Sequence, residues 1–137
     1  MGVSFYNNEG YGDPVPFMAI KEAEKKEKRF DFRPVVYICS PYKGDIEGNT
    51  DKARKYSRFA VDNGAIPIAP HLLLPQFMSE ETERDLAMFM NMVLLGRCAE
   101  IWVFSNGTET EGMKMEISRA EQRNMKIRYF TEEMKEA

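Results

Sequence analysis

Short apolar runs alternate with amphipathic stretches along most of this chain. Val35–Cys39 is a continuous run of β-branched and aromatic residues, which is typical of a strand buried on both faces. Residues 47–63 carry helical spacing and end in an Asn-Gly stop signal. The next predicted strand covers residues 65–69. Its Pro67 places it at a sheet edge, where a missing N–H costs no ladder bond.

The alternation continues to the end of the chain. We expect residues 70–81 to form a long loop and residues 82–96 to form a helix rich in Met and Leu. Glu100–Phe104 is the third predicted strand. Residues 110–124 follow as a helix with a threonine at its N-cap and acids in its first turn, and Lys126–Phe130 is the last strand.

This order of strands and helices predicts an α/β fold with a parallel sheet, right-handed crossovers and helices on both faces. We expect a three-layer, doubly wound sheet of flavodoxin or Rossmann-like type, with core strand order 2-1-3-4. The winding of such a sheet reverses between strands one and three, and a ligand cleft opens there at the carboxyl ends of the strands. Residues 40–45, 70–76 and 105–112 would line this cleft.

Composition and charge limit the functional classes. The chain has 137 residues, of which 43% are hydrophobic, and this fits one domain with one core. Residues 1–33 are expected to form an irregular arm and a charged helix, and residues 34–137 the domain. The net charge of −3 argues against general binding of nucleic acid or membranes. Without a signal peptide or a spanning segment in the sequence, we expect a cytoplasmic protein.

Cysteine and histidine are too sparse to indicate a metal site. The two cysteines, Cys39 and Cys98, each lie beside an apolar run and are expected to be reduced, buried thiols. The single histidine, His71, follows the second predicted strand. It is either a hydrogen-bonded structural residue or a ligand contact at the rim of the cleft. We therefore expect neither a metal nor a cofactor.

Two segments at the predicted cleft carry candidate chemistry. After the first strand, Ser40, Lys43 and Gly44 offer a hydroxyl, an ammonium and exposed N–H groups that can hold a phosphate or carboxylate. The same residues can also form an ordinary turn. Glu116 lies about one and a half turns into the third helix, between two apolar neighbours. The pattern alone leaves open whether Glu116 is exposed or faces the cleft.

The strings VVYICSPYKG and EGMKMEI, with a strand between them, resemble the nucleoside 2-deoxyribosyltransferase superfamily. They are most similar to its small bacterial and phage branch of DUF4406 type, which is related to deoxynucleoside 5′-monophosphate N-hydrolases. The resemblance covers roughly residues 34–130. It implies that Glu116 attacks the anomeric carbon of the sugar and forms a glycosyl ester, which water or another base resolves. It also implies that Tyr37 orients the Glu116 carboxylate.

We also expect a wider substrate-binding set, which the resemblance implies in part and to which the sequence itself adds His71 and Asn91. Its members are Ser40, Pro41, Tyr42, Lys43, Gly44, His71, Asn91, Thr110, Gly112 and Met113. The transferases have an aspartate at the position of Thr110, whereas the related N-hydrolases have a phosphate-binding serine there. Thr110 together with Lys43 therefore favours a nucleotide over a free nucleoside.

A second departure concerns the proton for the leaving base. The family has an aspartate on the helix before the third strand, and this chain has Met92 there, with Asn91 beside it. An amide hydrogen-bonds a base but supplies no proton. His71 is the candidate to replace the missing acid.

We therefore expect an N-glycosidic-bond enzyme, either an N-hydrolase or a deoxyribosyltransferase. Its substrate would be a nucleoside or nucleoside 5′-monophosphate, and its catalytic residues Glu116 and Tyr37. The alternative is a non-catalytic nucleotide-binding module that uses the same cleft, and a third is an interaction protein that uses its N-terminal arm. The relatives complete their sites with a neighbouring subunit, so a homodimer or higher homo-oligomer is expected.

Overall fold

The strands form one parallel sheet in a computed structural model that describes residues 31–137. The sheet is four-stranded, with the order β2-β1-β3-β4. β1 (Val35–Cys39) and β3 (Glu100–Phe104) lie in the centre, while β2 (Ile66–Ile68) and β4 (Lys126–Phe130) form the edges. The predicted fold class and strand order are confirmed, and Pro67 lies in an edge strand as expected.

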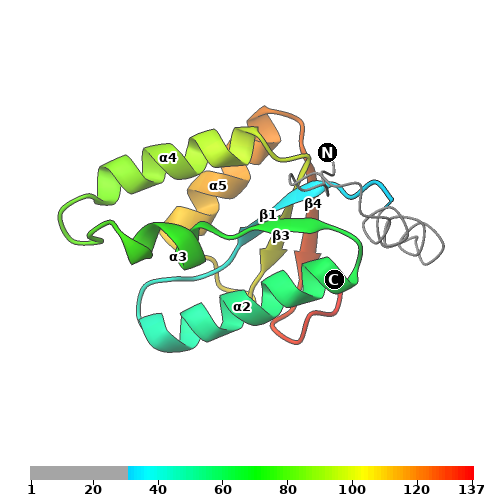
Figure 1. The fold of residues 1–137 in the computed structure, drawn as a ribbon, viewed down its shortest axis with the longest axis horizontal. Helices are drawn as coiled ribbons and strands as arrows, with labels where there is room; N and C mark the ends of the chain where they lie inside the picture. The colour runs from blue at the N-terminus through cyan, green and yellow to red at the C-terminus, as the bar shows by residue number, and fades with distance from the viewer. Residues whose placement is uncertain (1–30) are drawn as a thin grey trace, which may run out of the picture. The chain divides into compact units, whose positions relative to one another are not determined.

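Helices cover both faces of the sheet. α2 (Ile46–Asp62) packs on one face, and α4 (Arg84–Gly96) and α5 (Glu111–Gln122) pack on the other (Figure 1). Successive β1 side chains point to opposite faces. Val36 and Ile38 join the core under α2, whereas Tyr37 joins the core under α4 and α5. The alternation along β1 thus directs the Tyr37 side chain toward α5.

The predicted end of α2 and the predicted start of α5 are both present. α2 is followed by Asn63 and Gly64, and Gly64 has a φ of +83°, a conformation that glycine adopts without steric cost. Thr110 is the N-cap of α5, and its side chain accepts a hydrogen bond from the Met113 N–H at 3.2 Å. This cap fixes the start of the helix that carries Glu116.

The long loop predicted over residues 70–81 is wrong in its first half. Residues 70–76 form two short helices, α3 (Pro70–Leu73) and η2 (Leu74–Gln76). Pro70 occupies a first helical position, where its fixed φ is suitable and its missing N–H has no partner to lose. Leu74 is buried and anchors the segment. These helices are too short for periodicity to predict.

The predicted arm and charged helix of residues 1–33 lie almost entirely outside the described residues. Residues Pro34–Ala137 form one compact unit. In the part of the chain that is described, no helix has both the length and the apolar character needed to cross a bilayer.

Candidate functional site

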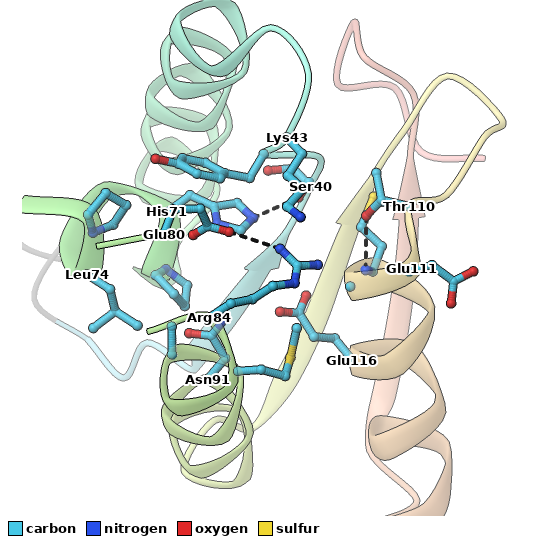
Figure 2. Close-up of a pocket in the computed structure, with 17 residues that line it drawn as sticks. Ser40, Lys43, His71, Leu74, Glu80, Arg84, Asn91, Thr110, Glu111 and Glu116 are labelled. Atoms are coloured by element: carbon cyan, nitrogen blue, oxygen red, sulfur yellow. Dashed lines mark hydrogen bonds and ion pairs between the residues drawn. The ribbon is translucent and has the colours of Figure 1, made fainter. Parts of the chain in front are cut away.

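A cavity of about 320 Å³ lies at the carboxyl end of β1, between α3, α4 and the start of α5 (Figure 2). This is the place in the sheet where the predicted cleft should open. The volume suits one small ligand. The predicted residues that line it are Ser40, Tyr42, Lys43, His71, Asn91, Thr110, Gly112, Met113 and Glu116.

Glu116 is buried at the wall of this cavity, with only 3% of its surface exposed. Helical spacing on α5 places it on the same buried face as Met113, Ile117 and Ala120. The Tyr37 hydroxyl donates a hydrogen bond to Glu116 Oε2 at 2.7 Å. Burial raises the pKa of the Glu116 carboxyl to about 7, against the opposing effect of this hydrogen bond. The carboxyl therefore titrates near neutral pH.

Tyr37 lies behind Glu116 and is not part of the cavity wall. Burial, reinforced by the neighbouring Glu116 carboxylate, holds the pKa of Tyr37 well above its usual value. The phenol therefore keeps its proton and remains a donor to the carboxylate. The hydrogen bond thus fixes the orientation of the Glu116 carboxyl at the cavity wall.

Two buried polar atoms of the cavity wall have no hydrogen-bond partner in the described chain. They are Ser40 Oγ and Asn91 Oδ1, on side chains that are 2% and 7% exposed. An unsatisfied buried polar group costs about 1–3 kcal/mol, and native proteins contain few of them. A polar ligand in the cavity would give these two groups hydrogen-bond partners.

His71 connects α3 to the end of β1. Its Nε2 lies 2.9 Å from the Ser40 carbonyl oxygen, and because a carbonyl only accepts, Nε2 carries the proton. The Tyr42 ring stacks on the imidazole at 4.8 Å between centroids. Burial lowers the pKa of His71, so the ring is neutral at pH 7. His71 thus has a structural hydrogen bond as well as a place in the cavity wall.

Of the remaining predicted residues, Gly112 lines the cavity, whereas Pro41 and Gly44 do not. At the start of α5, a Cβ added to Gly112 would lie 3.5 Å from the Met88 methyl, which is ordinary contact, so packing within the chain does not require glycine there. Pro41 and Gly44 belong to the turn after β1 but are not part of the cavity wall. Gly44 has a φ of +95°, so the turn geometry accounts for this glycine.

Glu80 and Arg84 line the cavity and were missed in the sequence. Arg84 Nη1 lies 3.0 Å from Glu80 Oε2, and the Arg84 side chain reaches across the cavity between Ser40 and Glu116 (Figure 2). The helical spacing of α4 could have identified Arg84 in the sequence. Arg84 precedes Asn91 by about two turns on α4, and residues at that spacing share a helix face.

Comparisons with known proteins give a family and a fold. The family described as "Domain of unknown function (DUF7768)" matches residues 34–130. No curated protein matches the chain. Among solved structures, a 2-deoxyribosyltransferase from the psychrotolerant bacterium Bacillus psychrosaccharolyticus is similar, with 15% identity and a TM-score of 0.56 over 71% of this chain and 72% of that one. This likeness agrees with the predicted superfamily fold. The DUF4406-type branch stays a prediction.

Proposed function

This chain belongs to the DUF7768 family, and we propose that it is an enzyme of the N-glycosidic bond that acts on a nucleoside or nucleoside 5′-monophosphate. One observation carries the proposal. A buried carboxyl, Glu116, lies at the wall of a ligand-sized cavity and accepts a hydrogen bond from Tyr37 at 2.7 Å. The likeness in fold to a 2-deoxyribosyltransferase supports the choice of chemistry. The cytoplasmic location expected from the sequence belongs to this proposal.

The proposed reaction has two steps at the anomeric carbon, C1′. A Glu116 oxygen attacks C1′, and the C1′–N bond breaks with its electron pair moving to the base nitrogen. Water then attacks C1′ of the glycosyl ester, which releases the sugar and regenerates the carboxylate. The net hydrolysis consumes one water, whose hydroxyl joins C1′ and whose proton joins the base. If another base replaces water, the outcome is transfer.

The environment of Glu116 suits the first step. Both transition states resemble an oxocarbenium ion, which a nearby carboxylate stabilises. Burial leaves the ionised carboxylate poorly solvated, and its pKa of about 7 means that a large fraction is ionised at neutral pH. The Tyr37 hydroxyl holds the carboxylate in one orientation. Tyr37 is therefore a positioning residue for the nucleophile.

Two residues of the cavity wall, Thr110 and Lys43, favour a 5′-phosphate on the substrate. Thr110 Oγ1 already accepts from the Met113 N–H, so its own proton is available to a phosphate oxygen. Lys43 and the N-terminus of α5 add positive charge to the same cavity wall. A nucleoside 5′-monophosphate is therefore preferred over the free nucleoside.

Protonation of the leaving base supports a second candidate function. Asn91 supplies no proton, and the neutral His71 ring already donates its Nε2 proton to Ser40. Neither residue fits the role of general acid at pH 7. This favours the alternative that the domain binds a nucleotide without cleaving it.

The deciding experiment is an assay for free base with a panel of ribo- and deoxyribonucleoside 5′-monophosphates. Glu116→Gln is the test variant. Glu121→Gln, on the exposed side of the same helix, is the matched control. Base release by the wild type and the control, but not by Glu116→Gln, supports the enzyme. A glycosyl adduct in the intact mass after acid quenching supports the covalent step. Ligand-induced thermal stabilisation without base release would instead leave a binding module.

A further inference from the structure

We propose that Glu80 competes with an oxyanion ligand of the cavity for the guanidinium of Arg84. In this mechanism a phosphate of the ligand takes Arg84 from Glu80. The identity of the molecule that carries the phosphate rests on the proposed function. The exchange of partners rests on the cavity alone.

Breaking the Glu80–Arg84 ion pair costs little free energy. The N–O distance is 3.0 Å, but the Arg84 and Glu80 side chains are 42% and 34% exposed. An ion pair with this much exposure contributes about 0–1 kcal/mol to stability. Its replacement by another partner for Arg84 therefore costs the fold little. Arg84 can therefore leave Glu80 for a ligand without destabilising the fold.

The Arg84 side chain points to two polar side chains at the end of β1 (Figure 2). Figure 2 shows its guanidinium extending from α4 toward Ser40 and Lys43 at the end of β1. Ser40 Oγ is buried without a hydrogen-bond partner in the described chain, so its hydroxyl is free to donate. A guanidinium, an ammonium and a hydroxyl around one space match the acceptor oxygens of a phosphate.

Charge favours the exchange once a phosphate enters. A phosphate carries about −1.5 to −2 charges at pH 7 and three acceptor oxygens, whereas Glu80 carries one charge at most. A guanidinium has five N–H donors, and a bidentate contact to phosphate uses two of them. Without a phosphate, Glu80 remains paired with Arg84. A neutral nucleoside then shares the cavity with the closed pair, so the exchange selects for phosphorylated ligands.

The test uses inorganic phosphate as the probe, followed by one matched pair of nucleoside and nucleoside 5′-monophosphate. Affinities of the full chain are measured by calorimetry at constant ionic strength. Arg84→Gln should weaken phosphate and monophosphate binding by about 10- to 100-fold, the usual range for a lost charged hydrogen bond. Glu80→Gln should tighten both by roughly 3- to 10-fold, because it removes the competing carboxylate. The nucleoside affinity should stay within about twofold in both variants.

Arg54→Gln is the matched control, because it breaks an exposed ion pair with Asp51 on α2. It should leave every affinity unchanged. Two outcomes overturn the competitor mechanism: weaker phosphate binding in Glu80→Gln, and unchanged phosphate binding in Arg84→Gln. A wild type that does not bind phosphate overturns it as well.

The same measurements distinguish a failure of the proposed function from a failure of the competition for Arg84. Arg84-dependent phosphate binding without base release from any nucleotide supports the exchange and contradicts the glycosidic reaction. Base release from monophosphates with unchanged affinities in both variants supports the glycosidic reaction and contradicts the competition for Arg84.

Discussion

Tyr37 on β1 and Glu116 on α5 are 79 positions apart in the sequence, yet their side-chain oxygens lie 2.7 Å apart in the buried interior. Neither residue can form this contact locally, because only the packing of α5 on the sheet brings the two elements together. The pair combines a phenol that keeps its proton with a carboxyl whose pKa is about 7. This contact should therefore influence how much of the Glu116 carboxyl is ionised near neutral pH.

Tyr37→Phe should raise the pKa of Glu116 further, because the hydrogen bond from Tyr37 favours the ionised carboxylate. With less carboxylate at pH 7, kcat/KM for the nucleotide should fall by about 10- to 100-fold. The rising limb of its pH profile should move to higher pH. The measurement is a pH–rate profile of base release.

Tyr56→Phe is the matched control for this experiment. Tyr56 is equally buried, but it lies on the opposite face of the sheet and its hydroxyl has no partner in the described residues. Its removal should leave the profile in place. An unshifted profile in Tyr37→Phe would show that the hydrogen bond does not tune Glu116.

Wild-type stability should carry a pH signature of Glu116. Its carboxyl has a pKa of about 7 in the folded chain and an ordinary value near 4.5 when unfolded. Between these values the folded chain binds more protons, so the contribution of Glu116 to the free energy of unfolding falls as pH rises from about 4.5 through 7. The loss should approach about 3 kcal/mol at pH 8. Glu116→Gln removes the titration and should therefore gain stability relative to wild type as pH rises.

Urea unfolding at pH 5 and pH 8 measures this difference. The comparison must be between wild type and variant, because His71 contributes a slope of opposite sign. Burial lowers its pKa, so the unfolded chain binds more protons and stability rises with pH around 6.5. Glu121→Gln should behave like wild type. An equal difference between Glu116→Gln and wild type at both pH values contradicts the raised pKa.

The strands were predictable from the sequence, but two parts of the cavity were not. β1, β3 and β4 have the bounds that the sequence predicts. The central strands β1 and β3 are apolar along almost their whole length because both of their faces are buried, whereas the edge strand β4 carries two charged residues. α3 and η2 were missed, because three or four residues are too few to show a helical period. Glu80 fell in the predicted loop and Arg84 in the predicted helix, but without α3 and η2 nothing in the sequence placed either side chain at the cavity. The burial of Glu116 also depends on tertiary packing, since its two sequence neighbours do not determine its helix face.

Ser40→Ala should separate stability from ligand binding. The Ser40 hydroxyl is buried and has no partner in the described chain, so its removal should stabilise the unliganded protein by up to about 1 kcal/mol. Nucleotide affinity should fall by about tenfold, because a ligand loses a hydrogen bond. Ser57→Ala is the matched control: its hydroxyl is also buried and unpartnered, but it lies on α2 away from the cavity. It should gain stability without losing affinity. Equal affinity losses in both variants would contradict the binding role of Ser40.

An exposed apolar face of α4 gives the expected homo-oligomer a structural basis. Leu86, Phe89 and Val93 are 49%, 64% and 45% exposed and share one side of the helix, at positions i, i+3 and i+7. Two acidic residues lie at the start of the helix, and three basic residues, from its C-cap and from the last turn and C-cap of α5, lie near its other end. The acids are Glu81 and Asp85, and the bases around the hollow next to Phe89 are Arg97, Arg119 and Arg123. An antiparallel contact with a second copy would join apolar centres and pair opposite charges at both ends.

We therefore expect a two-fold dimer through α4, and Phe89→Glu should convert it to a monomer. The new carboxylate would be buried against its own copy at the centre of the interface, where like charges are costly. Light scattering after size-exclusion chromatography measures the mass of both proteins. Phe77→Glu is the matched control, because Phe77 is just as exposed but lies outside this face, at the end of η2. It should remain dimeric. A wild type that is monomeric at high micromolar concentration would contradict this interface. A dimer that survives Phe89→Glu would place the contact on another surface.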